Sequence, residues 1–283
     1  MPRPTARMSP GRLTEESPQV TATTQPTDPT HPTYPPLDQA EILVTARSLD
    51  EYTAMFGLEA ADLEGRIVDC PGGAASAVAE ICASGGDALA VDPQYALGPD
   101  DLRARILSDV DRALADKRAS EVDYDWDVRG GVVGHETIRR AAAETMLGHL
   151  AAEPERYVAG SLPTLPLASD SADLVLCSHL LFTYADRLDF TDHVEAIVEM
   201  ARVAPEVRIY PLVDHAGNPL PELVRSVIAR LKKERLTSRI EPVIQPFQLA
   251  ATTRLVVERV APGPVDQPLT EQPSASAAEP PGR

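Results

Sequence analysis

The sequence has few cysteines and few aromatic residues. Its 283 residues include three cysteines, one tryptophan and four phenylalanines. Cys70, Cys82 and Cys177 are odd in number and lie in apolar segments, so we expect buried, reduced thiols and no disulfide framework. No cysteine–histidine spacing matches a metal site, and no metal is predicted. This use of cysteine is typical of an intracellular protein.

Long apolar runs are also missing. No segment approaches the roughly 20 apolar residues that a membrane-spanning helix needs. The N-terminus lacks the apolar core of a signal peptide. We therefore predict a cytoplasmic protein without a membrane partner.

Basic residues are scarce relative to acidic ones. Lysine and arginine total 26 against 43 aspartates and glutamates, and the net charge is −17. Such a surface repels phosphate backbones, which argues against a nucleic-acid partner. A small-molecule substrate suits this charge better, while the oligomeric state is not indicated.

Proline is concentrated at the two ends of the chain. Nine of the 27 prolines lie in residues 1–38 and six in residues 262–283, and neither stretch shows apolar periodicity. Such composition cannot bury enough surface to offset the entropy of ordering. We expect two disordered tails around one domain at residues 39–261.

Apolar runs and turn residues predict alternating strands and helices within that domain. The predicted strands are 66–70, 88–92, 157–159, 172–178, 207–213, 240–247 and 252–260. The predicted helices are 48–63, 74–84, 100–114, 137–152, 190–203 and 221–236. This alternation favours an α/β fold with a doubly wound, seven-stranded, mostly parallel sheet, and the closing hairpin makes the last strand antiparallel.

The most informative motif is a strand–turn–helix–strand unit at residues 66–92. The first strand reaches Asp69, a turn of small residues follows at 71–76, and the second strand ends on Asp92. Open parallel sheets bind nucleotide-like ligands at the carboxyl ends of such strands. Small turn residues let a ligand approach the backbone. The unit therefore predicts an adenosine-containing cofactor.

These residues resemble the class I S-adenosylmethionine-dependent methyltransferases over about residues 66–260. The segment 69–75 keeps the acid Asp69 and the glycine Gly73 of that family's first motif, with Pro71 and Ala75 at its outer glycine positions. Residues 159–167 and 171–175 are similar to its third and fourth motifs. The resemblance implies a Rossmann-like methyltransferase fold and S-adenosylmethionine as cofactor.

The resemblance also implies site residues, each with an ordinary structural alternative such as a turn, a helix cap or a core position. Asp92 is expected to bind the ribose of the cofactor. The full set of expected cofactor contacts is Asp69, Pro71, Gly72, Gly73, Ala75, Asp92, Gly160, Ser161, Leu162, Cys177 and Ser178. His179 is a weak candidate for a general base, and no other catalytic residue is indicated.

Residues 96–155 are longer than one helix and loop require, so we interpret them as a helical insertion after the second strand. An insertion there is expected to form a lid over the substrate. Tyr124, Trp126 and His135 are its candidate substrate contacts. The neighbouring acids Glu121, Asp123, Asp125 and Asp127 favour a cationic or neutral polar acceptor.

Together these features predict methyl transfer to a small-molecule acceptor. Two alternatives stay open. The first is a catalytically silent binding or scaffold protein, which the altered glycines favour. The second is a nicotinamide-dependent oxidoreductase, although residues 71–76 do not supply the Gly-x-Gly-x-x-Gly spacing that a pyrophosphate needs.

Overall fold

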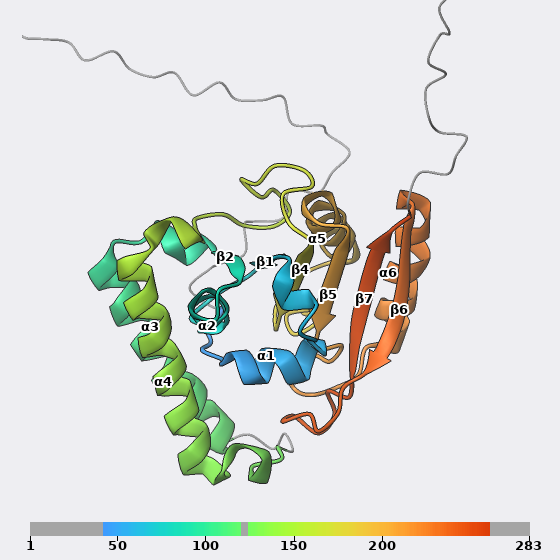
Figure 1. The fold of residues 1–283 in the computed structure, drawn as a ribbon. Coiled ribbons are helices and arrows are strands. Elements are labelled where there is room, and N and C mark those ends of the chain that lie inside the picture. The colour runs from blue at the N-terminus through green and yellow to red at the C-terminus, as the bar shows by residue number, and fades with distance from the viewer. Residues whose placement is uncertain (1–41, 120–123, 261–283) are drawn as a thin grey trace, which may run out of the picture. The chain divides into compact units, whose positions relative to one another are not determined.

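The computed structural model describes residues 42–119 and 124–260, which contain a seven-stranded sheet (Figure 1). Its strands are β1 (Arg66–Asp69), β2 (Asp87–Val91), β3 (Tyr157–Val158), β4 (Leu174–Ser178), β5 (Glu206–Tyr210), β6 (Leu236–Pro242) and β7 (Thr253–Arg259). The spatial order is β3-β2-β1-β4-β5-β7-β6. β1 to β5 pair in parallel, and β7 runs antiparallel to both of its neighbours. The predicted fold class is confirmed.

Six α-helices in the described residues cover the two faces of the sheet (Figure 1). They are α1 (Leu49–Phe56), α2 (Ala77–Ala83), α3 (Pro99–Ala119), α4 (Gly131–Ala152), α5 (Phe190–Val203) and α6 (Pro221–Leu231). Neighbouring strand residues point to opposite faces. Ile67 accordingly joins the apolar cluster under α1 to α4, whereas Val68 joins the cluster under α5 and α6.

The first helix is shorter than the predicted 48–63. α1 ends at Phe56 because Gly57 takes a left-handed conformation, with φ at 59°, and its N–H bonds to the carbonyl of Thr53. Only glycine adopts this cap without strain. Ser48 and Glu51 form the capping box expected at the other end.

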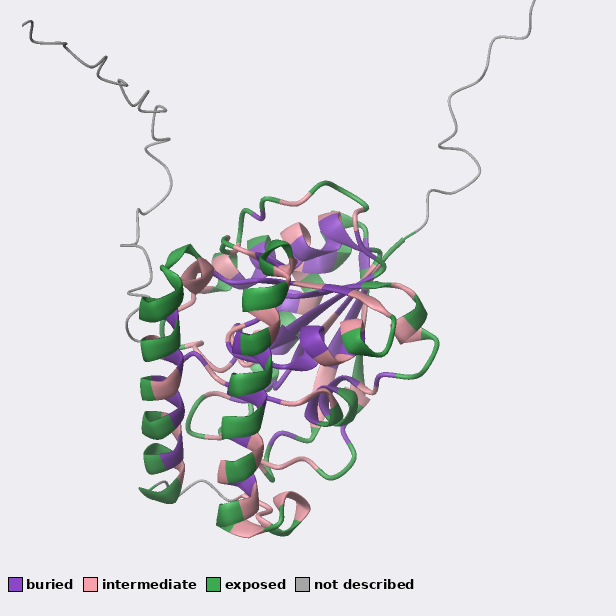
Figure 2. Cartoon of the chain, turned by 60° about the vertical axis from the view of Figure 1, so that its left-hand side comes forward, coloured by how far each residue is buried: buried purple, intermediate pink, exposed green. Residues whose placement is uncertain are grey.

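The insertion at residues 96–155 is part of the core of this domain. α3 and α4 pack side by side, and their buried residues include Ile106 and Met146, both fully inaccessible. Figure 2 shows the buried stripes of the two helices turned inward and their outer faces exposed. These two helices therefore extend the helical layer next to α2.

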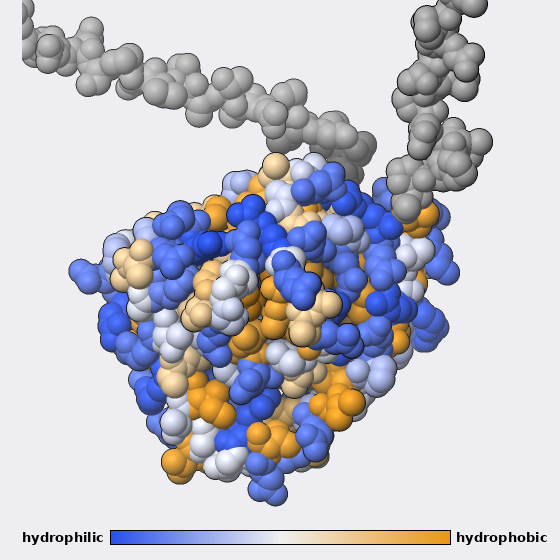
Figure 3. Space-filling view, in the orientation of Figure 1, coloured by the Kyte–Doolittle hydropathy of each residue, from blue (hydrophilic) through white to orange (hydrophobic). Residues whose placement is uncertain are grey.

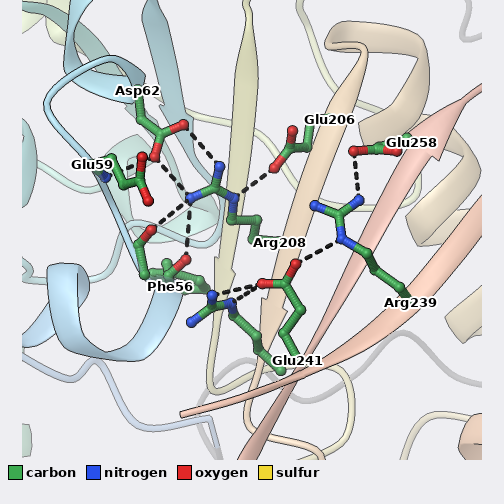
Figure 4. A network of polar contacts seen from close by, with 10 residues as sticks. Phe56, Glu59, Asp62, Glu206, Arg208, Arg239, Glu241 and Glu258 are labelled. Carbon is green, nitrogen blue, oxygen red and sulfur yellow. Dashed lines mark hydrogen bonds and ion pairs between the residues drawn. The ribbon is translucent and has the colours of Figure 1, made fainter. Parts of the chain in front are cut away.

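Arg208 of β5 ties the first helix to the sheet (Figure 4). Its guanidinium binds both carboxylate oxygens of Asp62 at 2.8 and 2.9 Å, Glu206 at 2.6 Å and the carbonyl oxygen of Phe56 at 3.2 Å. These bonds fix the carboxyl end of α1 against β5.

The described surface seen in Figure 3 is largely hydrophilic, with apolar residues scattered among the polar ones. Among the described residues, no helix combines the length and apolarity needed to cross a bilayer.

Candidate functional site

The two predicted acids end adjacent strands of the sheet. Asp69 closes β1, is 1% exposed, and lies within hydrogen-bond distance of the Tyr52 hydroxyl through both oxygens. Burial raises the pKa of Asp69 to about 8, although the bond from Tyr52 opposes this. At neutral pH this carboxyl is therefore largely protonated.

Asp92 follows β2 and holds the glycine turn. Its Oδ2 accepts the N–H of Gly73 at 3.0 Å, and its Oδ1 accepts that of Gln94 at 2.9 Å. The residue is 6% exposed, and burial raises its pKa to about 6. Tyr95 closes the same corner by donating to the carbonyl of Gly73 at 2.9 Å.

All five N–H groups of the turn at residues 72–76 are bonded within the protein. Besides the bond from Gly73 to Asp92, Gly72 bonds to Val91 and Ala75 to Gly72. The two remaining N–H groups, of Ala74 and Ser76, donate to the carbonyls of Thr45 and Arg47. The turn therefore has no free donor to offer a ligand in this conformation.

Residues 42–47 form a strap over the turn. Asp109 of α3 accepts the Val44 N–H at 2.9 Å, and Arg139 of α4 donates to the carbonyl of Ala46 at 2.5 Å. A Cβ atom at Gly73 would lie 3.1 Å from the carbonyl oxygen of Thr45. The strap thus occupies the space that the first-motif glycine was expected to leave open.

This arrangement does not accommodate S-adenosylmethionine as it stands. The expected residue types are present at the expected strand ends, but their polar groups are bonded to the strap and to one another. A cofactor can reach the turn only if the strap separates from it.

Four of the remaining predicted cofactor contacts lie after β3 or at the end of β4. Gly160, Ser161 and Leu162 follow β3, and Gly160 bonds to the carbonyl of Asp92, which places this loop beside the acid. Ser178 ends β4 and bonds to the His179 ring at 2.9 Å.

Two of the expected contacts, Cys177 and Ala75, lie in the apolar core in this structure. The Cys177 side chain is inaccessible and belongs to the apolar core under α5, because its position in β4 points it to the opposite face. Ala75 packs into the core under α1 to α4. Pro71 and Gly72 remain at the turn, where Gly72 packs against Ala90.

A cavity of about 480 Å³ lies next to this edge, between α1, the end of α3, the loops after β4 and β5, and the loop between β6 and β7. Its lining includes Arg47, Glu51, Met55, Lys117, Tyr124, Arg129, Arg139, His179, Thr183, Tyr210 and Phe247. Of the residues predicted from sequence, His179 and Tyr124 line it. The expected cofactor contacts do not.

His179 is held in a strained conformation at the cavity wall. Its φ is 51°, in the left-handed region, and its ring meets Tyr210 edge to face at 5.4 Å. Burial, with the positive charges of Arg47 and Lys117, lowers the pKa of His179 well below its ordinary value. The ring is therefore neutral at neutral pH, and its protonation is disfavoured.

The insertion contributes to the cavity through fewer residues than expected. Tyr124 stacks on Phe247 at 4.9 Å and lines the cavity. Trp126 and His135 pack behind it, with His135 stacked on Phe247 at 4.5 Å. In this structure these rings fasten the insertion to the β6–β7 loop, and their contact with substrate stays a prediction.

Of the four acids predicted beside the aromatic residues, the two that the structure describes do not line the cavity. Asp125 and Asp127 are not part of its lining, and Glu121 and Asp123 lie outside the described residues. The described wall carries the cations Arg47, Lys117, Arg129 and Arg139, together with acids from other positions such as Glu51. Sequence reasoning missed these because each falls on a different element. Within the described residues, no cluster of potential metal ligands occurs.

No protein-family model matches the sequence. An uncharacterised protein of Methanocaldococcus jannaschii is 24% identical over 201 residues, which cover 70% of this chain and 91% of that one.

Several solved methyltransferases are similar in structure. A putative S-adenosylmethionine-dependent methyltransferase of Methanococcus maripaludis is 13% identical, with 76% of this chain and 84% of that one covered and a TM-score of 0.34. The 1,6-didemethyltoxoflavin-N1-methyltransferase of Burkholderia thailandensis, solved with S-adenosylhomocysteine, is 13% identical, with 69% and 72% covered and a TM-score of 0.35. The bifunctional kinase-methyltransferase WbdD is 13% identical with a TM-score of 0.40, and the match spans 75% of this chain and 38% of that one.

These TM-scores are too low to transfer an activity. The assignment of the fold therefore rests on the strand order of this chain and on its antiparallel strand β7. By that criterion the chain has the Rossmann-like fold of the class I methyltransferases.

Proposed function

We propose that the chain is an S-adenosylmethionine-dependent methyltransferase that acts on a small-molecule acceptor. The observation that carries the proposal is the pair of acids, Asp69 and Asp92, at adjacent strand ends around a glycine turn and next to a cavity of about 480 Å³. The cavity is large enough to hold a small organic molecule and to exclude water from it.

The acceptor would be oriented by the cavity wall. His179 is the described residue best placed to take a proton from it, since Nδ1 is bonded to Ser178 and Nε2 remains for a ligand. Its lowered pKa keeps the ring neutral and also makes it a weaker base than an ordinary histidine. Cofactor binding at the turn requires the strap to separate from residues 72–76.

The second candidate is a binding protein with this fold but without catalysis. The fully bonded turn specifically favours it, because a chain that no longer binds a cofactor is free to fill the site with its own residues. A nicotinamide-binding protein needs the same turn N–H groups for a pyrophosphate, so the same observation weakens that alternative.

Isothermal titration of the intact chain with S-adenosylhomocysteine and with NAD separates these candidates. The proposal expects saturable binding of S-adenosylhomocysteine and no heat from NAD. Asp92→Asn should weaken that binding by about tenfold or more, as the loss of a charge-assisted bond implies. Asp87→Asn, at the opposite end of the same strand, is the matched control and should bind normally. A folded wild-type chain that binds neither compound supports the silent candidate.

A further inference from the structure

The cavity wall has an excess of positive charge in a strongly acidic protein. Arg47 from the strap, Lys117 from α3, Arg129 and Arg139 all line the same cavity. The chain as a whole carries a net charge of −17. With Arg187, five basic residues line the cavity against the four acidic residues Glu51, Asp116, Asp186 and Asp214, whereas acidic residues greatly outnumber basic ones in the chain as a whole.

One carboxylate accounts for only part of this charge. Arg139 binds both oxygens of Glu51 at 2.5 Å, and Arg129 lies 3.3 Å from the same carboxylate. Within residues 42–119 and 124–260, neither Arg47 nor Lys117 forms an ion pair with an acid. Among the described residues, Arg47 and Lys117 therefore have no paired carboxylate, and the Lys117 ammonium lies 5.8 Å from the ring centroid of Tyr124.

Arg47 is the clearest case of a buried cation on this wall without an acidic hydrogen-bond partner among the described residues. Its side chain is buried, with the residue only 7% exposed, yet its one side-chain hydrogen bond in the described residues goes to the neutral hydroxyl of Thr45. A buried guanidinium without an anion is costly. Burial and the nearby charge of Arg139 lower the pKa of Arg47 to about 10. Burial and the charge of Arg47 lower the pKa of Lys117 to about 7.

The other acids of the lining do not neutralise this wall. Asp116 and Asp186 are exposed to solvent. Asp214 is bonded to Asn218 within its own turn, at 2.9 Å. Met55 and Phe247 add apolar surface to the same cavity.

We propose that Arg47 and Lys117 bind the anionic group, a carboxylate or a phosphate, of a small organic molecule that occupies this cavity. The apolar residues would hold its carbon skeleton. Guanidinium and ammonium groups recognise both kinds of anion, and a bound anion would replace the missing counter-charge. The inference rests on the cavity and holds whether or not the protein transfers methyl groups.

Two molecules could bring such an anion: the acceptor, or the cofactor through its amino-acid carboxylate. Sulfate is the first probe, because it is a stable anion unrelated to either. We expect millimolar sulfate, at constant ionic strength against chloride, to raise the melting temperature of the intact chain. Lys117→Gln and Arg47→Gln should weaken sulfate binding by about tenfold or more.

Arg118→Gln is the matched control, since it removes the same charge from the adjacent position of α3, where Arg118 pairs with Glu136 outside the cavity. It should bind sulfate as the wild type does. Equal sulfate binding by Lys117→Gln, Arg47→Gln and Arg118→Gln would overturn the proposal, as would a wild-type chain indifferent to sulfate. If Arg47→Gln does not fold, Lys117→Gln decides alone.

The source of the anion is resolved by comparing S-adenosylhomocysteine with 5′-methylthioadenosine, which lacks the carboxylate. If Lys117→Gln weakens binding of the first compound alone, the cofactor supplies the anion. If it weakens sulfate binding and leaves both adenosine compounds unaffected, the acceptor supplies it. Failure of the methyltransferase proposal would remove S-adenosylhomocysteine binding from all variants and leave the sulfate result unchanged.

Discussion

The hydroxyl of Tyr52 lies 2.9 and 3.1 Å from the two carboxylate oxygens of Asp69. Both residues are 1% exposed, so this contact closes the carboxyl end of β1 from inside the protein. It joins the first helix to the first strand at the edge where a cofactor was expected. The acid therefore has a structural partner before any ligand arrives.

The Asp69 contact predicts a pH-dependent stability. The folded state holds the Asp69 proton up to a pKa of about 8, against an ordinary value of 3.8. Stability from this group is thus complete at acid pH and falls as pH rises from about 4 to about 8. Asp69→Asn should remove this loss. The unfolding free energy of the variant should therefore rise relative to that of the wild type as the pH approaches 8. Urea unfolding at pH 5 and pH 8 measures it, and a constant difference between the two proteins would contradict the assignment.

A change that loosens the strap should lower the stability of the protein and raise its affinity for S-adenosylhomocysteine. Asp109 holds the strap through the N–H of Val44 and through Arg105. Asp109→Asn should lower the melting temperature, because a buried charged acceptor is weakened. It should also tighten S-adenosylhomocysteine binding, since the open state becomes more populated.

Arg103→Gln is the control for the strap, because Arg103 lies on α3 like Asp109. Its ion pair with Glu144 of α4 is exposed. It should change neither the melting temperature nor the affinity appreciably. An Asp109→Asn protein that loses stability and affinity together would show that the strap does not compete with the ligand.

Gly73 should not tolerate a side chain even without a ligand. Its φ of 52° is left-handed, and an added Cβ would lie 3.1 Å from the Thr45 carbonyl oxygen. We expect Gly73→Ala to cost about 1 kcal/mol or more of unfolding free energy. Gly98→Ala, with no atom within 4 Å of the added Cβ, should cost less. Chemical denaturation compares them, and equal losses would contradict the geometry of the turn.

The ionic network of β5 should be important for stability. Arg208→Ala removes a mostly buried guanidinium and leaves Asp62 and Glu206 without their shared partner. We expect a loss of about 1–3 kcal/mol. Arg225→Ala breaks an exposed pair with Glu222 and should cost under about 0.5 kcal/mol. Similar losses in thermal unfolding would mean that the network in Figure 4 contributes little.

The sheet could be predicted because its signals are local. Strand β4 is buried along its whole length and is apolar up to its last residue, Ser178. Helix α5 begins and ends where its capping acid and apolar spacing indicate. The boundary of α1 was missed because one glycine, Gly57, overrode the apolar pattern that continues to residue 63.

The cavity could not be predicted because its charges come from distant parts of the chain. Arg47 precedes the first helix, whereas Lys117 and Arg139 lie on α3 and α4. Only the packing of these elements brings the three cations together. The strap was missed for a similar reason: its bonds to residues 74 and 76 use backbone carbonyls, which leave no side-chain signature in the sequence.

Hydrogen exchange with and without S-adenosylhomocysteine tests the central claim, that the cofactor binds at this turn by displacing the strap. With ligand, the amides of residues 72–76, Asp92, Gln94 and Tyr95 should stay protected or gain protection, while those of Leu43 and Val44, which are bonded in the closed state, exchange faster. Protection changes confined to other segments, or no change under saturating ligand, would contradict the account.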